Sequence, residues 1–228
     1  MAADRPQQIP IDLAPAPSFA ADDFVPTPSN QLALAFLDNW PDWPQVGAIL
    51  VGPAGAGKSH LASIIAERAA TAIQQLASIA AIDKDANLII LDCGEGGAFD
   101  EEALFHLINH LRLSDRPTGR LLLLTREEPK QWALRLPDLL SRLNALDLVR
   151  IDPPDDFSLM VVLHKLFADR QVSVDDSVID YLIRRMPRSY QAAHHIVHLM
   201  DHAGLAQKKR LTRAIAAQAL TDGGFQAE

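Results

Sequence analysis

Eight consecutive residues have the types and spacing needed to hold a phosphate. They read Gly52-Pro53-Ala54-Gly55-Ala56-Gly57-Lys58-Ser59, which is a complete GxxxxGK[ST] motif. Glycines let the backbone turn its N–H groups inward around an anion, because only residues without a Cβ adopt the required angles cheaply. Lys58 supplies a positive charge for the β- and γ-phosphates, and the Ser59 hydroxyl can bind Mg²⁺. We therefore predict a nucleotide-binding loop; the alternative is an ordinary glycine-rich turn.

A strand and a helix must hold this loop in place. Residues 46–51 form an apolar run that leads into it, and Leu61, Ile64 and Ile65 follow it with helical spacing. The first turn of that helix would aim its positive dipole end at the same phosphates. We expect nucleotide contacts from the residues of the loop and the one that follows it: Pro53, Ala54, Gly55, Ala56, Gly57, Lys58, Ser59 and His60.

Two further strand ends carry polar residues that suit the same site. The continuous apolar run 88–91 predicts a strand buried on both faces, and it ends in Asp92, which could hold the Mg²⁺ shell beside Ser59. The next predicted strand, 121–124, ends in Thr125, which could hydrogen-bond the γ-phosphate or the attacking water. For both residues the alternative is a polar side chain that only closes or packs a strand end. A second acid usually follows this aspartate in ATPases to orient the water, whereas this chain has Cys93 there.

Composition excludes several classes of protein. The chain has 228 residues, of which 48% are hydrophobic and 22% charged, so it is long enough for one substantial core with a smaller satellite domain. Its single cysteine excludes an internal disulfide, and no apolar stretch approaches the roughly 20 residues of a membrane span. The N-terminus lacks the pattern of a signal peptide, so we expect a cytoplasmic protein. A net charge of −8 argues against a broad nucleic-acid surface, although a local patch at 208–210 is an alternative.

The chain divides into three expected parts. Residues 1–23 are polar and proline-rich and should form a flexible tail; 24–152 should form a parallel α/β core; and 153–228, after the double proline, should form a small helical domain. Ser29 or Asn30 should cap the first helix of the core. The core should then contain a short strand near Ile73, a short helix near Ile79, helices over 101–113 and 139–146 and a strand over 148–151. The helical domain should contain helices over 156–169, 175–186, 189–203 and 211–220.

A hexapeptide in the tail has the pattern of a docking peptide. It reads Gln8-Ile9-Pro10-Ile11-Asp12-Leu13, with apolar residues alternating behind a glutamine. An extended peptide of this kind can place alternate side chains into pockets of a partner protein. An inert tail is the alternative interpretation from the pattern alone.

Together these features resemble the AAA+ ATPases, and more closely their DnaA/Hda branch. The resemblance extends over about residues 8–220 and is carried by four stretches: Phe24-Val25 with Pro28-Ser29-Asn30, Gly57-Lys58-Ser59-His60-Leu61, residues 101–107 and residues 136–143. The last two stretches resemble the Hda regulators of DnaA. The chain also ends where DnaA would continue into a DNA-binding helix-turn-helix domain, which favours the Hda side of the branch.

The resemblance implies a fold, cofactors and partners. It implies an AAA+ P-loop core with a helical lid, bound ADP or ATP with Mg²⁺, and weak intrinsic ATPase activity. Hda proteins dock on the β sliding clamp, the β subunit of DNA polymerase III, through an N-terminal hexapeptide, which residues 8–13 match. They then stimulate hydrolysis of ATP bound to DnaA and so limit replication initiation. We therefore expect a homo-oligomer, as a dimer. We also expect contact with DNA only through the clamp and no contact with a membrane.

The resemblance also assigns two arginines. Arg142, in the stretch 136–143, matches the arginine finger that reaches a neighbour's nucleotide, here that of DnaA. The sensor 2 arginine of the lid is replaced by Gln191. Arg188, one turn earlier on the same helix face, is the candidate substitute, and a surface arginine is the alternative interpretation. Two functions compete with this one. The first is an autonomous P-loop ATPase or phosphotransferase, and the second is a helicase-loader-like module that binds single-stranded DNA.

Overall fold

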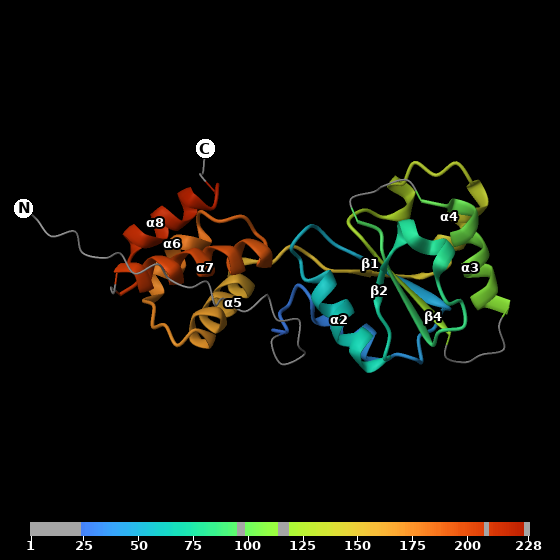
Figure 1. Ribbon diagram of the computed structural model, residues 1–228, viewed down its shortest axis with the longest axis horizontal. Helices are drawn as coiled ribbons and strands as arrows, with labels where there is room; N and C mark the ends of the chain where they lie inside the picture. The colour runs from blue at the N-terminus through green and yellow to red at the C-terminus, as the bar shows by residue number, and fades with distance from the viewer. Residues whose placement is uncertain (1–23, 95–98, 114–118, 208–209, 226–228) are drawn as a thin grey trace, which may run out of the picture. The chain divides into compact units, whose positions relative to one another are not determined.

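The computed structural model describes residues 24–94, 99–113, 119–207 and 210–225, drawn in colour in Figure 1. The hexapeptide at 8–13 lies outside the described residues. The chain forms two compact units that divide between Pro153 and Pro154. The first unit carries the sheet and the second is helical, and each is described by itself below.

A parallel sheet of five strands forms the first unit. Its spatial order is β2-β3-β4-β1-β5, and every neighbouring pair is parallel. The strands are β1 Gly47–Val51, β2 Ile73–Gln75, β3 Leu88–Asp92, β4 Arg120–Thr125 and β5 Asp147–Arg150. The central strands are apolar along their length because both faces of the sheet are covered. The expected α/β fold is confirmed.

Helices cover the two faces of this sheet (Figure 1). Alternate strand residues such as Leu50 and Ile90 face the helices α1 Gln31–Asp38 and α2 Lys58–Arg68. Their neighbours, such as Ile49 and Leu123, face the opposite helices α3 Glu101–Leu113 and α4 Pro137–Leu143. The short turns η2 Leu76–Ala81 and η3 Pro129–Gln131 complete the unit. Two apolar layers, one on each face, therefore hold the strands of the sheet in place.

Most of the predicted elements of the core are confirmed, with two corrections at helix ends. Asn30 does not cap α1 through its side chain, because its amide accepts from the N–H of Thr27 (2.8 Å) and donates to the carbonyl of Val25 (3.1 Å). The helix expected over 139–146 is α4, which begins earlier, at Pro137, and ends at Leu143. Proline suits the first turn of a helix, where its missing N–H costs nothing.

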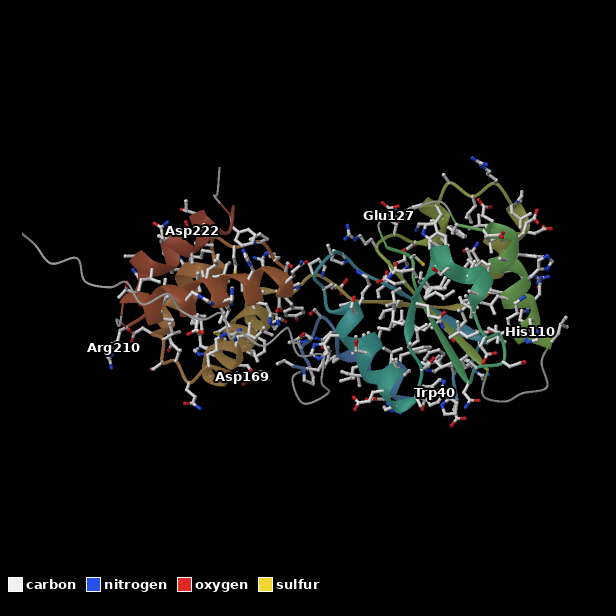
Figure 2. The ribbon with its side chains drawn as sticks, viewed as in Figure 1. Trp40, His110, Glu127, Asp169, Arg210 and Asp222 are labelled. Atoms are coloured by element: carbon white, nitrogen blue, oxygen red, sulfur yellow. The ribbon has the colours of Figure 1, made fainter. Side chains whose placement is uncertain are left out.

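Four helices form the second unit: α5 Asp156–Asp169, α6 Asp176–Ile183, α7 Tyr190–Gln207 and α8 Arg213–Asp222. They pack around buried aliphatic side chains such as Leu163, Ile179 and Ile196, while Asp169, Arg210 and Asp222 lie on the outside (Figure 2). The helix expected over 175–186 stops early, at Ile183, and the one expected over 189–203 extends to Gln207. No helix within the described ranges is long and apolar enough to cross a membrane.

Candidate functional site

The phosphate loop, residues 52–57, joins β1 to α2, and its glycines are required by its geometry. Gly55 and Gly57 adopt φ values of +70° and +98°, in the left-handed region that favours glycine. At Gly52, a Cβ would lie 2.8 Å from the carbonyl oxygen of Ile151 on the neighbouring chain segment. Gly57 directly precedes α2, so the loop leads into the positive end of that helix. These glycine conformations and the helix start are the features that an anion-binding loop requires.

Lys58 places its ammonium group against the phosphate loop itself. Its Nζ donates to the carbonyl oxygens of Gly52 (2.5 Å) and Pro53 (2.9 Å). Burial, followed by the positive charge of Arg126, lowers the pKa of Lys58, while Asp92 acts in the opposite direction. Lys58 therefore lies within electrostatic reach of Asp92 at the end of β3 and of Arg126 directly after β4.

The remaining loop positions differ in what they offer a ligand. Pro53 and Ala54 are exposed, whereas Ala56 is buried and its N–H donates to the carbonyl of Pro53 at 3.3 Å. The ring of His60 lies edge-on to the ring of Phe24, with centroids 5.2 Å apart. His60 therefore faces the segment that precedes α1.

Asp92 and Ser59 supply oxygen atoms that suit Mg²⁺. Asp92 ends β3, and one of its carboxylate oxygens accepts from the N–H of Gly94 at 2.9 Å. Ser59 is exposed in the first turn of α2. Carboxylate and hydroxyl oxygens beside a phosphate are the ligands that Mg²⁺ prefers, so these residues fit the metal.

Cys93 cannot replace the water-orienting acid that the sequence lacks. Burial, helped by the adjacent Asp92 carboxylate, raises the pKa of the Cys93 thiol to about 12. At neutral pH the thiol is therefore protonated and has no charge with which to accept a proton from water.

Thr125 uses its hydroxyl to close a turn after β4. Thr125 is buried, and its Oγ1 donates to the carbonyl of Glu127 (3.0 Å) and accepts from the N–H of the same residue (3.3 Å). The hydroxyl proton that could hydrogen-bond a phosphate is therefore already donated to the carbonyl of Glu127. This arrangement favours the structural interpretation of Thr125.

Arg126 is the site residue that the sequence reasoning missed. It follows Thr125 and, with Cys93 and Gly94, lines a cavity of about 660 Å³ that also contacts Phe99, Trp132 and Arg135. An arginine after a strand is common in sequences, and only the strand order puts this one beside the phosphate loop.

Arg142 contacts an aromatic side chain of the neighbouring helix. It lies on α4, is partly buried, and its guanidinium lies over the ring of Phe105 on α3, 5.8 Å from the centroid. The ring of Phe105 on α3 therefore covers part of the guanidinium. The start of α4 is also anchored to α3, since the Glu101 carboxylate accepts from the N–H groups of Arg135 and Leu136 at 2.8–3.1 Å.

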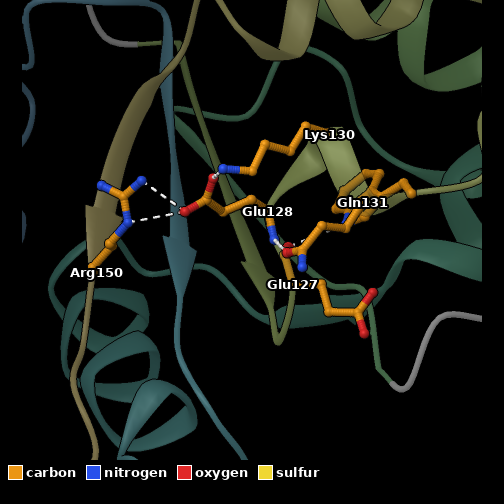
Figure 3. Close-up of polar contacts among 6 residues, drawn as sticks. Glu127, Glu128, Lys130, Gln131 and Arg150 are labelled. Atoms are coloured by element: carbon orange, nitrogen blue, oxygen red, sulfur yellow. Dashed lines mark hydrogen bonds and ion pairs between the residues drawn. The ribbon is translucent and has the colours of Figure 1, made fainter.

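Arg150 belongs to a separate charge cluster (Figure 3). Its Nε and Nη2 both donate to one oxygen of Glu128, at 3.1 and 2.7 Å, and Lys130 pairs with the other oxygen at 2.7 Å. Hydrogen bonds from Lys130 and then from Arg150 lower the pKa of Glu128. The cluster links η3 to β5, and Figure 3 shows the Glu127 side chain pointing away from it.

The expectation that Arg188 lies on the same helix as Gln191, one turn earlier, is wrong. α7 begins only at Tyr190, with the Ser189 hydroxyl accepting from the N–H of Ala192 at 3.3 Å, so Arg188 lies before the helix. Its Nη1 pairs with Asp156 at 2.8 Å, at the start of α5, and both side chains are more than half exposed. Gln191 is exposed in the first turn of α7.

Comparison with known proteins gives one family match and several structural matches. Residues 156–220 match the family model described as the Hda lid domain. Domain III of the replication initiation protein DnaA from Thermotoga maritima is 14% identical, with 93% of this chain and 99% of that chain covered and a TM-score of 0.72. AMPPCP-bound DnaA from Aquifex aeolicus is 19% identical, with 85% and 69% covered and a TM-score of 0.70. The RuvB Holliday junction branch migration motor of Thermotoga maritima is 17% identical, with 85% and 67% covered and a TM-score of 0.61.

Proposed function

We propose that this chain is an Hda-like regulator of replication initiation, because residues 156–220 match the Hda lid model and the fold is similar to that of DnaA domain III. In this proposal an ADP-bound protein docks on the DNA-loaded β sliding clamp and stimulates hydrolysis of DnaA-bound ATP. The match of residues 156–220 to the Hda lid carries the proposal. The fold by itself is shared with RuvB and so does not select a function.

The phosphate loop is proposed to hold ADP or ATP through the backbone of residues 53–60 and the ammonium of Lys58. The left-handed glycines and the start of α2 support this proposal, as does the solved DnaA of similar fold that is bound to AMPPCP. Ser59 and Asp92 would hold Mg²⁺, which would neutralise phosphate charge. Cys93 stands at the position expected for the water-orienting acid, and its thiol is protonated at neutral pH, so intrinsic hydrolysis should be slow.

The partners are proposed from the peptide pattern and the lid family. Residues 8–13 would dock on the clamp, so contact with DNA would be indirect, and the protein would act as a dimer. Arg142 would serve as the arginine finger toward DnaA, with Phe105 holding its guanidinium until it engages. Arg188 would serve as the substitute for sensor 2 only by leaving its ion pair with Asp156.

The decisive experiment measures hydrolysis of radiolabelled ATP pre-bound to DnaA. The four mixtures contain DnaA with or without this protein and with or without clamp loaded on DNA. Rapid hydrolysis only with both additions is the expected result. Hydrolysis of free ATP at several turnovers per second without DnaA would indicate an autonomous ATPase, and clamp-independent binding to single-stranded DNA would indicate a helicase-loader-like module.

A further inference from the structure

Histidines are concentrated on one helix of the second unit. The chain has eight histidines, and four of them lie on α7: His194, His195, His198 and His202. All four lie outside the buried stripe of this helix, which is formed by Ala192, Ala193, Ile196, Val197 and Met200. The core of the unit therefore does not bury these imidazoles, and no step of the proposed function uses them.

Two of these histidines form a pair on the side of α7 that faces away from the buried stripe. His198 and His202 are four residues apart, so one turn of the helix places them next to each other on one face. Their ring centroids are 4.5 Å apart, and the ring planes meet at 61°. Both residues are partly exposed. The helix therefore holds two imidazoles side by side, within reach of solvent.

This arrangement has the chemistry of a transition-metal chelate. Imidazole nitrogen is a ligand that Zn²⁺, Ni²⁺ and Cu²⁺ share. Two histidines at positions i and i+4 on one helix face also hold the zinc ion in the H-E-x-x-H motif. Each ring has two nitrogens, so one can bind the metal while the other keeps a hydrogen bond, as metal-bound histidines usually do. The pair therefore supplies two nitrogen ligands, each about 2.0–2.1 Å from a bound zinc ion.

Water would supply the other ligands of the metal. In the part of the chain that the structure describes, no group of three or more His, Cys, Asp or Glu side chains is placed to hold a metal ion. Asp201, next to His202, faces Arg170 at 3.8 Å. The ring of His195 contacts the ring of Phe225, with centroids 5.9 Å apart. The site would therefore be an open one, with reversible binding.

We infer that His198 and His202 together bind a divalent transition-metal ion such as Zn²⁺, Ni²⁺ or Cu²⁺, and that the bound ion ties one turn of α7 to the next. This site is separate from the proposed nucleotide site, because Mg²⁺ prefers oxygen ligands and would not compete for two imidazoles. Metal binding to the folded helix also stabilises the folded state by mass action.

Calorimetric titration of the untagged full chain with Ni²⁺ tests the inference. The variants are His198→Gln and His202→Gln, and the matched control is His195→Gln, which removes an exposed histidine of the same helix. The wild type should bind one Ni²⁺ at its tightest site. Each variant of the pair should weaken that binding by at least about tenfold, because a single imidazole remains. His195→Gln should bind as the wild type does.

Thermal melting with and without Ni²⁺ gives a second measurement. Ni²⁺ should raise the melting temperature of the wild type and of His195→Gln, and should not raise that of His198→Gln or His202→Gln. Glutamine is a good helix former, so the variants should fold, and their melting temperatures without metal show whether they do. Equal Ni²⁺ affinity in the wild type and in folded His198→Gln or His202→Gln would overturn the inference. An equal loss in His195→Gln would also overturn it, because binding would then be spread over the histidines of α7.

Discussion

Lys58 is the residue proposed to offer a positive charge to the nucleotide, and its ammonium is held by two carbonyls of the phosphate loop. We predict that Lys58→Ala loses ADP binding by more than about tenfold, because a charge-assisted contact to phosphate is removed. Fluorescent ADP titration measures the loss. The wild type alone should hydrolyse ATP slowly or not at all. An alanine variant with wild-type affinity would place the nucleotide elsewhere.

Arg142 is the residue on which stimulation of DnaA is proposed to depend. Arginine fingers supplied in trans are worth roughly 10³–10⁵ in rate in GTPases. We predict that Arg142→Ala removes most of the stimulated hydrolysis while ADP binding, clamp binding and the melting temperature stay near wild type. Arg142→Lys should rescue little, because an ammonium lacks the planar fork of a guanidinium.

The control for Arg142 must be an arginine with no structural role. Arg150 is less suitable, because its removal would open the cluster with Glu128 and Lys130. Arg135 is exposed, and only its backbone N–H bonds to Glu101. If Arg142→Ala stimulated DnaA as well as the wild type while Arg135→Ala lost the stimulation, Arg142 would not be the arginine finger.

At the scale of elements, Glu101 fixes the start of α4 from the neighbouring helix α3. Its carboxylate accepts two backbone N–H groups, and replacing it by alanine leaves both without that acceptor. We predict that Glu101→Ala lowers the stability of the core by about 1 kcal/mol and reduces stimulation of DnaA, with ADP affinity unchanged. Glu102→Ala is the matched control, because it removes an exposed acid from the same first turn. Equal melting temperatures for the two variants would refute the anchoring role.

Asp155 makes the start of α5 sensitive to pH. It accepts from the N–H of Ser158 at 2.7 Å, and hydrogen bonding from Ser158 lowers the pKa of Asp155 below its ordinary value. A depressed carboxyl pKa stabilises the folded state above the unfolded pKa of about 3.9, and this contribution is lost as the pH falls through the folded pKa. We therefore predict that Asp155→Ala costs about 1 kcal/mol at pH 7 and much less in strong acid.

A cap that does not titrate provides the comparison for Asp155. Thr212 caps α8 by accepting from the N–H of Ile215 at 3.5 Å. Urea unfolding of Thr212→Ala should show a loss of stability that does not follow the titration of a carboxyl. If the Asp155→Ala loss were equally independent of pH, the carboxylate charge would not be its cause.

At the scale of the whole molecule, the clamp contact should be separable from folding. Residues 8–13 precede the first described element, which begins at Gln31. We predict that deleting them, or replacing Gln8 and Leu13 by alanine, abolishes clamp binding in surface plasmon resonance without changing the melting temperature. Unchanged clamp affinity in the deletion variant would leave the hexapeptide with no role in docking.

The sequence by itself determined the elements whose signals are local. The phosphate loop, the buried runs that became β3 and β4, and the helix over 101–113 could be read from residue types and spacing alone. Such features depend on neighbours within a few residues, because glycine geometry and hydrophobic periodicity act over that range. The same locality limits the prediction of helix ends: α4 begins at Pro137, which suits the first turn of a helix, and α7 continues to Gln207.

Only the tertiary structure decided which distant residues share the site. The order β2-β3-β4-β1-β5 places β4 between β1 and β3, and so brings Arg126 into electrostatic reach of Lys58. The packing of α4 against α3 likewise puts Arg142 over Phe105. Neither relation has a sequence signal, because parallel strands are joined through helices and their spatial order does not follow their order in the chain.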